Sequence, residues 1–187
     1  MGNVLAGMTT SLDGYINDRN GSAQSLSPDF EELLETQSFK DMIESTGAVI
    51  MGRNTYEMMD PFLWVNDDYE FQVPLFILTH KAPEKSPKGN DKLSVTFVTD
   101  GVESIISQAK AAAGNKIVQI IGGADTIQQC LNSGLCDELQ IDIMPILLGE
   151  GLSLYGNIDT DKIKLERTSV EQITPMRTSI TFKVKKS

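Results

Sequence analysis

Residues 47–57 of this chain read GAVIMGRNTYE, and the run from Ala48 to Met51 is too apolar to remain exposed. A short, β-branched and continuously apolar run is typical of a strand buried on both faces of a parallel sheet. Gly52 ends the run, and we expect a helix to begin near Tyr56. The turn between them lies at the carboxyl end of a strand, where unpaired backbone N–H groups favour the binding of an anion.

The side chains of this turn, Gly52-Arg53-Asn54-Thr55, suit a phosphate group. Arg53 offers a planar guanidinium that matches phosphate geometry. Thr55 offers a hydroxyl that either caps a helix or contacts a phosphate. The alternative is an ordinary strand-to-helix turn with a surface arginine, because short glycine motifs recur by chance.

The remainder of the chain alternates between strand and helix patterns. A helical stretch, as one helix or two, is expected from Ser27-Pro28-Asp29 to about residue 45, and further helices over residues 101–113 and 124–131. Other strands are expected at residues 3–8, 73–78, 93–98, 116–121 and 139–146, followed by an antiparallel hairpin at residues 163–172 and 176–184. This order predicts an α/β fold with a largely parallel sheet covered on both faces, in a single domain spanning residues 1–187.

The composition argues against several classes of function. A net charge of −10 disfavours a nucleic-acid-binding protein, which carries a basic face. No apolar run approaches the length of a membrane span, and the N-terminus lacks the pattern of a signal peptide, so we expect a cytoplasmic protein. The cysteines, Cys130 and Cys136, and the single histidine, His80, do not have the spacing of a zinc site. We therefore expect no metal and two reduced, partly buried cysteines.

Three of the expected strands end in residues that suit a ligand with several phosphates. In parallel α/β sheets, ligands bind at the carboxyl ends of the strands, and a dinucleotide is the natural candidate here. On this interpretation His80 contacts a ribose or a phosphate; otherwise it is a solvent-exposed loop residue. The three segments are Gly52-Arg53-Asn54-Thr55, Thr79-His80-Lys81 and Gly122-Gly123-Ala124-Asp125-Thr126.

Four stretches of the chain are similar, in this order, to the dihydrofolate-reductase-like superfamily. They are Ser11-Leu12-Asp13-Gly14, VIMGRNTYE, VQIIGGADTI and DELQIDIMPILLGEG. The chain most resembles the reductase half of the bifunctional deaminase-reductase of riboflavin biosynthesis, and the free-standing bacterial proteins built from that half. Each motif is short, but their order and compatible spacing together form a specific signal.

The resemblance implies a three-layer α/β/α dihydrofolate-reductase-like fold, an NADPH cofactor and a homodimer. The Arg53 turn would hold the pyrophosphate and the 2′-phosphate side, and the segment around His80 would lie by the adenosine ribose. The segment that begins with Gly122-Gly123 would contact the pyrophosphate and the nicotinamide ribose, and a cis peptide would join the two glycines. Residues near Ala6, with the loops at Asp13 and at residues 149–151, would border the nicotinamide.

Hydride transfer needs no covalent catalyst from the protein, but reduction of an imine or a carbonyl also needs a proton. We predict Asp13, Asp29 and Glu32 as catalytic candidates, since dihydrofolate reductases place an acid near the first helix. The alternatives are an Asx turn at Asp13 and solvated first-turn carboxylates at Asp29 and Glu32. Substrate contacts are predicted at Asp13, Leu63, Trp64 and Glu150, with core packing as the alternative for Trp64.

The match departs from the riboflavin enzymes on the substrate side. A glutamate that contacts substrate there is replaced by Ile121, and an arginine by Asn66. The leading hypothesis is an NADPH-dependent reductase that acts on a C=N or C=O bond of a small heterocycle, resembling 5-amino-6-(5-phosphoribosylamino)uracil reductase. Weak dihydrofolate reduction, a dinucleotide-binding module without turnover and a dimeric scaffold without ligand are the alternatives.

Overall fold

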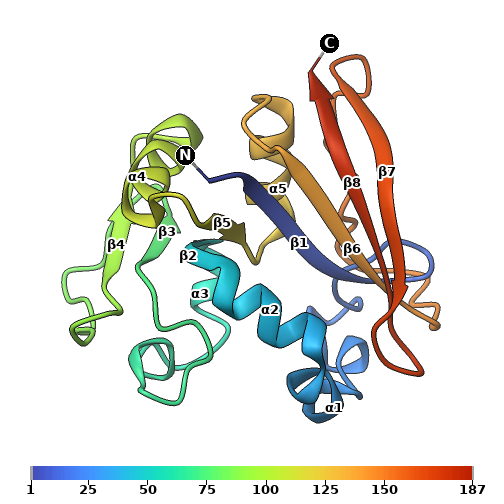
Figure 1. The fold of residues 1–187 in the computed structure, drawn as a ribbon, viewed down its shortest axis with the longest axis horizontal. Helices are drawn as coiled ribbons and strands as arrows, with labels where there is room; N and C mark the ends of the chain where they lie inside the picture. Colours follow the sequence, from blue (N-terminus) through green and yellow to red (C-terminus); the bar gives the residue numbers. More distant parts are fainter. Residues whose placement is uncertain (1, 187) are drawn as a thin grey trace.

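A computed structural model describes residues 2–186 and contains an eight-stranded sheet (Figure 1). The strands are β1 (Val4–Ser11), β2 (Thr46–Gly52), β3 (Leu75–Leu78), β4 (Val95–Val98), β5 (Ile117–Ile120), β6 (Glu138–Met144), β7 (Ile163–Gln172) and β8 (Thr178–Lys186). Their order across the sheet is β4-β3-β2-β5-β1-β6-β8-β7. Neighbours from β4 to β6 are parallel, whereas β8 is antiparallel to both β6 and β7.

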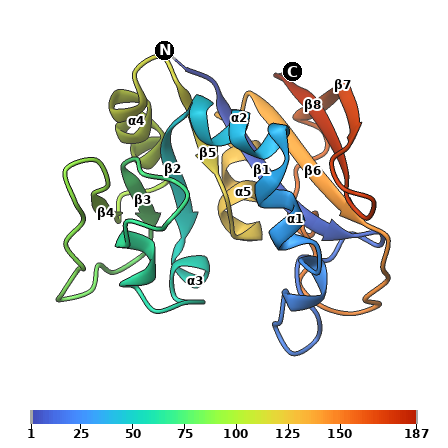
Figure 2. The same cartoon turned by 60° about the horizontal axis from the view of Figure 1, so that its bottom comes forward.

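Helices cover both faces of the sheet. α4 (Val102–Ala113) and α5 (Ala124–Asn132) pack on one face, and α1 (Phe30–Glu35) and α2 (Gln37–Ser45) lie over the other (Figure 2). The expected three-layer fold with a C-terminal antiparallel hairpin is therefore confirmed. Within the described residues, no helix combines the length and the apolar character needed to cross a membrane.

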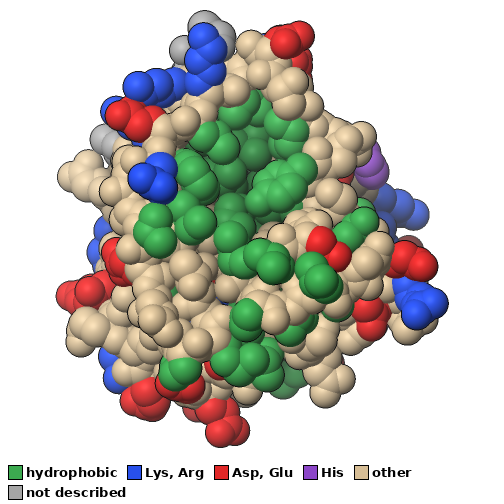
Figure 3. Space-filling model, turned by 90° about the vertical axis from the view of Figure 1, so that its right-hand side faces the viewer, with side chains coloured by type: hydrophobic (Ala, Val, Ile, Leu, Met, Phe, Trp, Pro, Cys, Tyr) green, Lys and Arg blue, Asp and Glu red, His purple; other side chains and the backbone are tan. Residues whose placement is uncertain are grey.

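β7 forms one edge of the sheet and carries exposed apolar side chains. Leu165 is 47% exposed and Val170 is 53% exposed. Figure 3 shows hydrophobic side chains gathered in a hollow on the side of the molecule where β7 and β8 lie. This side therefore offers apolar surface next to an open strand edge.

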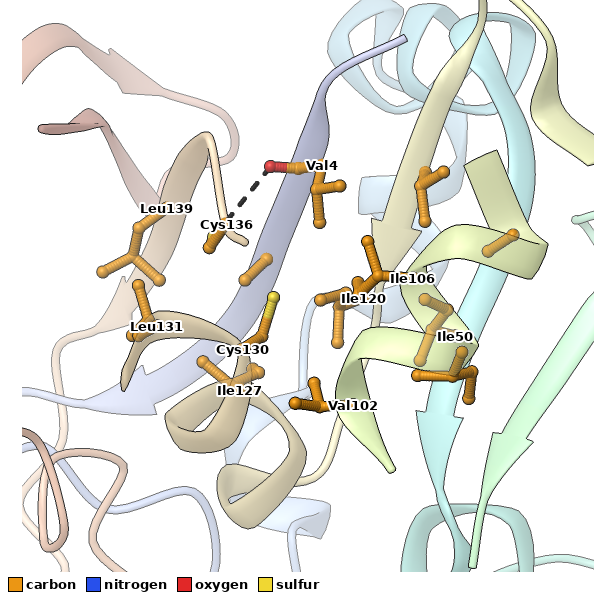
Figure 4. Close-up of a cluster of buried hydrophobic side chains, with 14 of the residues drawn as sticks. Val4, Ile50, Val102, Ile106, Ile120, Ile127, Cys130, Leu131, Cys136 and Leu139 are labelled. Atoms are coloured by element: carbon orange, nitrogen blue, oxygen red, sulfur yellow. Dashed lines mark hydrogen bonds between the residues drawn. The ribbon is translucent and has the colours of Figure 1, made fainter. Parts of the chain in front are cut away.

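The apolar run of β2 is buried on both faces, as its sequence predicts. Ile50 packs toward α4 and α5, in the cluster of Figure 4 that includes Val102 and Ile127. Val49 and Met51 face the other way, in a second cluster that includes residues of α2. Each strand residue is thus covered by one of the two helical layers.

Both cysteines are free and fully buried in the core of Figure 4, more deeply than the partial burial that the sequence predicts. The Cys136 thiol donates to the Glu138 carbonyl at 3.0 Å. A hydrogen bond with Cys136, together with burial, raises the pKa of the Cys130 thiol. Cys130 is therefore an inert packing residue.

One helix begins and ends elsewhere than the sequence predicts, and the stretch that the sequence left open as one helix or two is settled as two. The helix expected from Tyr56 is instead a single turn, α3 (Arg53–Tyr56), which begins directly after Gly52 and ends at Tyr56. The helical stretch after Ser27 is two helices, because Thr36 adopts an extended conformation and its hydroxyl caps α2 by accepting the Phe39 N–H at 3.2 Å.

Candidate active site

The carboxyl ends of β3, β2, β5 and β1 meet at one edge of the sheet because these strands are parallel. Gly52, at the end of β2, lies beside Gly122, which follows β5. The Gly52 N–H donates to the Gly122 carbonyl at 2.8 Å. The two glycine turns that the sequence singled out therefore form one structure.

Threonine side chains occupy the space beside these glycines. A Cβ atom on Gly52 would lie 2.5 Å from Thr126 Oγ1, and a Cβ atom on Gly122 would lie 2.9 Å from Thr55 Oγ1. At Gly123 the same distance to Thr55 Oγ1 would be 3.2 Å. We call these five residues the glycine cradle; the two threonine side chains fill the space beside its glycines, and Gly52 and Gly122 are buried.

Helix α5 starts directly from the glycine cradle. Its N-cap is Gly123, which makes no side-chain capping bond, and the Gly122–Gly123 peptide bond is cis, as the resemblance implies. Ala124 is buried, whereas Asp125 is exposed and accepts a hydrogen bond from Gln129 Nε2 at 2.6 Å. The uncapped first turn of this nine-residue helix favours an anion through its N–H groups and its dipole.

Cationic side chains follow the same strand ends. Arg53 is exposed, and its Nε donates to Glu57 Oε1 at 2.7 Å. Thr79 is buried, and its hydroxyl accepts the Lys81 N–H at 3.3 Å, which leaves His80 and Lys81 exposed. Asn54 is exposed as well. This placement is compatible with phosphate and ribose contacts, which stay predictions.

A cavity of about 890 Å³ lies between the sheet and the layer of α1 and α2. This volume is in the range of small-molecule sites. Ile121 lines the cavity and directly precedes Gly122, so the cavity adjoins the glycine cradle. The helix and loop side of the lining is mainly apolar and aromatic but includes the carboxylates of Asp41 and Glu70; its apolar and aromatic residues are Phe30, Leu33, Phe39, Met42, Met59, Trp64, Tyr69 and Phe71. The sheet side, which we call the floor, carries polar side chains beside the apolar Leu5, Ile117 and Ile121; the polar residues are Thr9, Gln119, Gln140, Asp142, Ser179 and Thr181.

The family model of the RibD C-terminal domain matches residues 3–177. The chain belongs to this family. It is similar to a putative riboflavin biosynthesis protein from Shewanella sp. PV-4, with 28% identity and a TM-score of 0.77 over 98% of this chain and 99% of that one. The resemblance inferred from the sequence is therefore confirmed at the level of family.

Two more distant structures share the fold of this RibD-type domain. A deaminase/5-amino-6-(5-phosphoribosylamino)uracil reductase from Thermotoga maritima is 16% identical, with a TM-score of 0.68 over 98% of this chain and 57% of that protein. A dihydrofolate reductase from Enterococcus faecalis, solved with NADP(H), is 18% identical, with a TM-score of 0.62 over 97% of this chain and 96% of that one. The dihydrofolate-reductase-like fold is thus confirmed.

In this RibD-type domain, Asp29 is not the solvated carboxylate that its place at a helix start predicts. It is 6% exposed, and its Oδ1 accepts from Arg177 Nη2 at 2.7 Å. Burial raises the pKa of Asp29, but hydrogen bonds from Arg177 and Thr174 outweigh it and hold the pKa below its ordinary value. This environment argues for an ionised structural partner and against a proton donor. Glu32 is exposed on α1 and lies outside the cavity lining.

Asp13 joins two loops instead of facing the cavity. Its carboxylate accepts from Ser11 Oγ at 2.5 Å, from the Leu148 N–H at 3.2 Å and from the Gly149 N–H at 2.8 Å. The hydrogen bond from Ser11 lowers the pKa of Asp13. Glu150 is exposed in the loop that Asp13 holds. Both residues lie outside the cavity lining, so their predicted substrate contacts would require the loop to move.

The remaining predicted contacts divide between cavity and core. Trp64 lines the cavity and also packs, since it is 6% exposed and its Nε1 donates to the Tyr56 carbonyl at 2.8 Å. Leu63 is 49% exposed and lies outside the lining. The side chain of Ala6 is fully buried in the cluster that contains α5. Its neighbour Gly7 faces the cavity instead.

Sequence reasoning missed Arg177 and the polar floor of the RibD-type cavity. Arg177 follows a turn in the tail hairpin, and nothing local indicates its burial. The floor did leave a signal, because the alternation in residues 138–144 places Gln140 and Asp142 on one face of β6. Gln119 gave no such signal, because it lies in the apolar run of residues 116–121, which is typical of a buried strand.

Proposed function

We propose that this protein is an NADPH-dependent reductase that transfers hydride to a C=N or C=O bond of a small heterocyclic substrate. The observation that carries the proposal is the glycine cradle, which adjoins the cavity through Ile121. Membership of the RibD C-terminal domain family supports the same class of reaction. A homodimer, which rests on the resemblance, and a cytoplasmic location, which rests on the sequence pattern, are parts of this proposal.

The residues present fit a dinucleotide. A pyrophosphate needs N–H donors, and the uncapped first turn of α5, which starts at Gly123 of the cradle, offers them. Arg53 adds a guanidinium for phosphate oxygens. The apolar wall of the cavity would exclude water from a nicotinamide and its acceptor. When bound, the cofactor supplies the hydride, and the protein supplies binding and orientation.

A titration with NADPH and then NADH tests this proposal. Quenching of Trp64 fluorescence reports the binding, and calorimetry confirms it. We expect NADPH to bind more tightly than NADH. The Arg53→Ala change should weaken NADPH binding and reduce the preference for NADPH over NADH, because the 2′-phosphate loses its cation. Lys164→Ala, which removes an exposed cation on β7, is the matched control and should change neither affinity. Unchanged NADPH affinity in Arg53→Ala would count against the site.

A binding module without turnover is the second candidate, and one observation favours it. Ile121 lines the cavity at the position where the resemblance implies a glutamate, so the cavity lacks that acid. Tight NADPH binding with no cofactor oxidation against pterins, pyrimidines and carbonyl compounds would support this candidate. Dihydrofolate reduction through Asp29 is disfavoured, because Arg177 already binds that carboxylate.

A further inference from the structure

Gln119 on β5 is a buried amide without a protein partner. Its side chain lines the cavity and is 3% exposed, and it makes no side-chain hydrogen bond with any residue in the range 2–186. Buried amides in proteins are normally paired, because an unmade hydrogen bond costs free energy. Gln128 shows the ordinary case: it is 4% exposed and its Nε2 donates to the Leu154 carbonyl at 2.8 Å. The amide of Gln119 is instead open to the cavity, where it is free to pair with a ligand.

The neighbouring strands extend this polar surface. β1 lies between β5 and β6, and Gly7 of β1 is paired with Gln140 of β6. A Cβ atom on Gly7 would lie 2.7 Å from Gln119 Nε2, so the glycine leaves the amide of Gln119 uncovered. Two residues further along, Thr9 is paired with Asp142. Gln119 of β5 and Gln140 and Asp142 of β6 thus lie on one face of the sheet, at the floor of the cavity, on either side of β1. Gln140 Nε2 donates to Asp142 Oδ1 at 3.2 Å.

The charges of the cavity are one-sided. Among the described residues that line it there is no lysine, arginine or histidine. Four carboxylates line it: Asp41, Glu70, Asp142 and Glu171. Asp142 is paired with Arg177, whose Nη1 lies 3.5 Å from Asp142 Oδ2. A phosphate monoester placed here would still meet the carboxylates of Asp41, Glu70 and Glu171 without a lysine, arginine or histidine in the lining, and such a pairing is unfavourable.

The cation closest to the floor is already saturated by the protein. Arg177 is 1% exposed, and its Nε and Nη2 donate to Asp29 at 3.1 and 2.7 Å. Its Nη1 donates to Thr9 Oγ1 at 2.8 Å and to Asp142 Oδ2 at 3.5 Å, and its Nη2 also donates to the Leu26 carbonyl at 3.3 Å. Arg177 therefore has no free nitrogen to offer a phosphate group.

We infer that the cavity takes an unphosphorylated nitrogen heterocycle, neutral or cationic, whose amide-like edge pairs with Gln119 and whose N–H group donates to Asp142. A ring amide matches a glutamine side chain, because each offers one donor and one acceptor side by side. The aromatic wall at Phe30 and Trp64 suits a flat ring. Naming this ligand as the substrate rests on the proposed function, whereas its binding in the cavity does not.

Matched pairs of compounds test the charge part of the inference. A diaminouracil riboside and its 5′-phosphate form one pair, and a hydroxymethyl-dihydropterin and its phosphate monoester form the other. Calorimetry should find that at least one unphosphorylated compound binds with a Kd below about 1 mM and at least about tenfold more tightly than its phosphate. Equal or tighter binding of the phosphates would overturn the inference. It would also be overturned if none of the four compounds binds.

Two glutamine variants test the role of Gln119. Gln119→Met removes an unpaired amide, so the free energy of unfolding should hold or rise while the affinity for the preferred compound falls about tenfold or more. Gln128→Met is the control. It removes a satisfied buried hydrogen bond, so the free energy of unfolding should fall while the affinity for the preferred compound stays unchanged. Full affinity in a folded Gln119→Met protein would overturn the inference.

The cofactor titration separates this inference from the proposed function. Binding of an unphosphorylated compound without any binding of NADPH would sink the reductase proposal and leave the cavity assignment intact. Binding of NADPH combined with a preference for phosphorylated compounds would support the reductase proposal and overturn the cavity assignment. Glu171→Gln provides a further check, because the removal of one carboxylate should narrow the discrimination against phosphate.

Discussion

Arg177 and Asp29 form a buried ion pair, with Arg177 Nη2 2.7 Å from Asp29 Oδ1 and side chains that are 1% and 2% exposed. The pair joins the start of β8 to the residue before α1. Thr174, in the turn that precedes β8, adds a hydroxyl that donates to Asp29 Oδ2 at 2.6 Å. The ion pair thereby holds the cavity floor against the helical layer that covers it.

Breaking this pair should destabilise the protein strongly. Arg177→Met leaves the Asp29 carboxylate buried without its cation, and such changes cost about 3–5 kcal/mol. Denaturant unfolding followed by circular dichroism measures the effect. Glu166→Gln, which breaks the exposed ion pair with Lys185, is the control and should leave the unfolding midpoint nearly unchanged. Similar midpoints for Arg177→Met and the control would contradict the structural role of the pair.

The ion pair also predicts how stability depends on pH. The pKa of Asp29 is lower in the folded protein than its ordinary value. Such a carboxyl stabilises the fold above its unfolded pKa of about 3.9, and this contribution is lost as the pH falls through the lower folded value. The difference in unfolding free energy between the native sequence and Asp29→Asn should therefore shrink as the pH is lowered from 6 toward 3. A difference that is constant over this range would show that Asp29 is not held ionised by Arg177.

The glycine cradle predicts a steric effect at Gly52. Gly52→Ala is allowed by the backbone, with φ of −79°, but its Cβ would lie 2.5 Å from Thr126 Oγ1. The threonine must move, and overpacking of this kind lowers the free energy of unfolding by about 1–3 kcal/mol. If the cradle holds the cofactor, the displaced threonine should also lower NADPH affinity by roughly tenfold, a loss of about 1.4 kcal/mol in binding free energy.

Two comparisons make this experiment decisive. Adding Thr126→Ala to Gly52→Ala should recover part of the lost affinity, because the clash disappears, and a double-mutant cycle reports that coupling. Gly156→Ala is the matched control, since a Cβ there meets nothing within 4 Å. Equal affinities for Gly52→Ala and Gly156→Ala would mean that the cofactor does not use the cradle.

Local patterns in the sequence were sufficient for the fold and for the cradle. The glycine that ends β2 and the glycine pair at 122–123 each lie at a strand end, so parallel topology places both at one edge of the sheet. That β2 and β5 are neighbours, so that the two turns touch, is shown by the structure. The environment of Asp29 was not predictable in the same way. Its partner Arg177 is 148 residues away along the chain, and a helix-start aspartate reads as solvated until that contact is known. Long-range polar pairing is what the local pattern lacks.

The exposed edge strand predicts self-association. Leu165 and Val170 on β7 are about half exposed, and the same side of the molecule gathers hydrophobic side chains in a hollow (Figure 3). An unpaired strand edge with exposed apolar side chains is a template for pairing with a second chain. We therefore expect a homodimer in size-exclusion chromatography with light scattering, and a shift toward monomer when Val170→Glu places a charge on this edge. Met58→Glu, at a position that is 63% exposed and follows α3, is the control and should leave the dimer intact. A monomeric native protein would show that this edge does not associate. A dimer that both variants retain would place the association surface elsewhere.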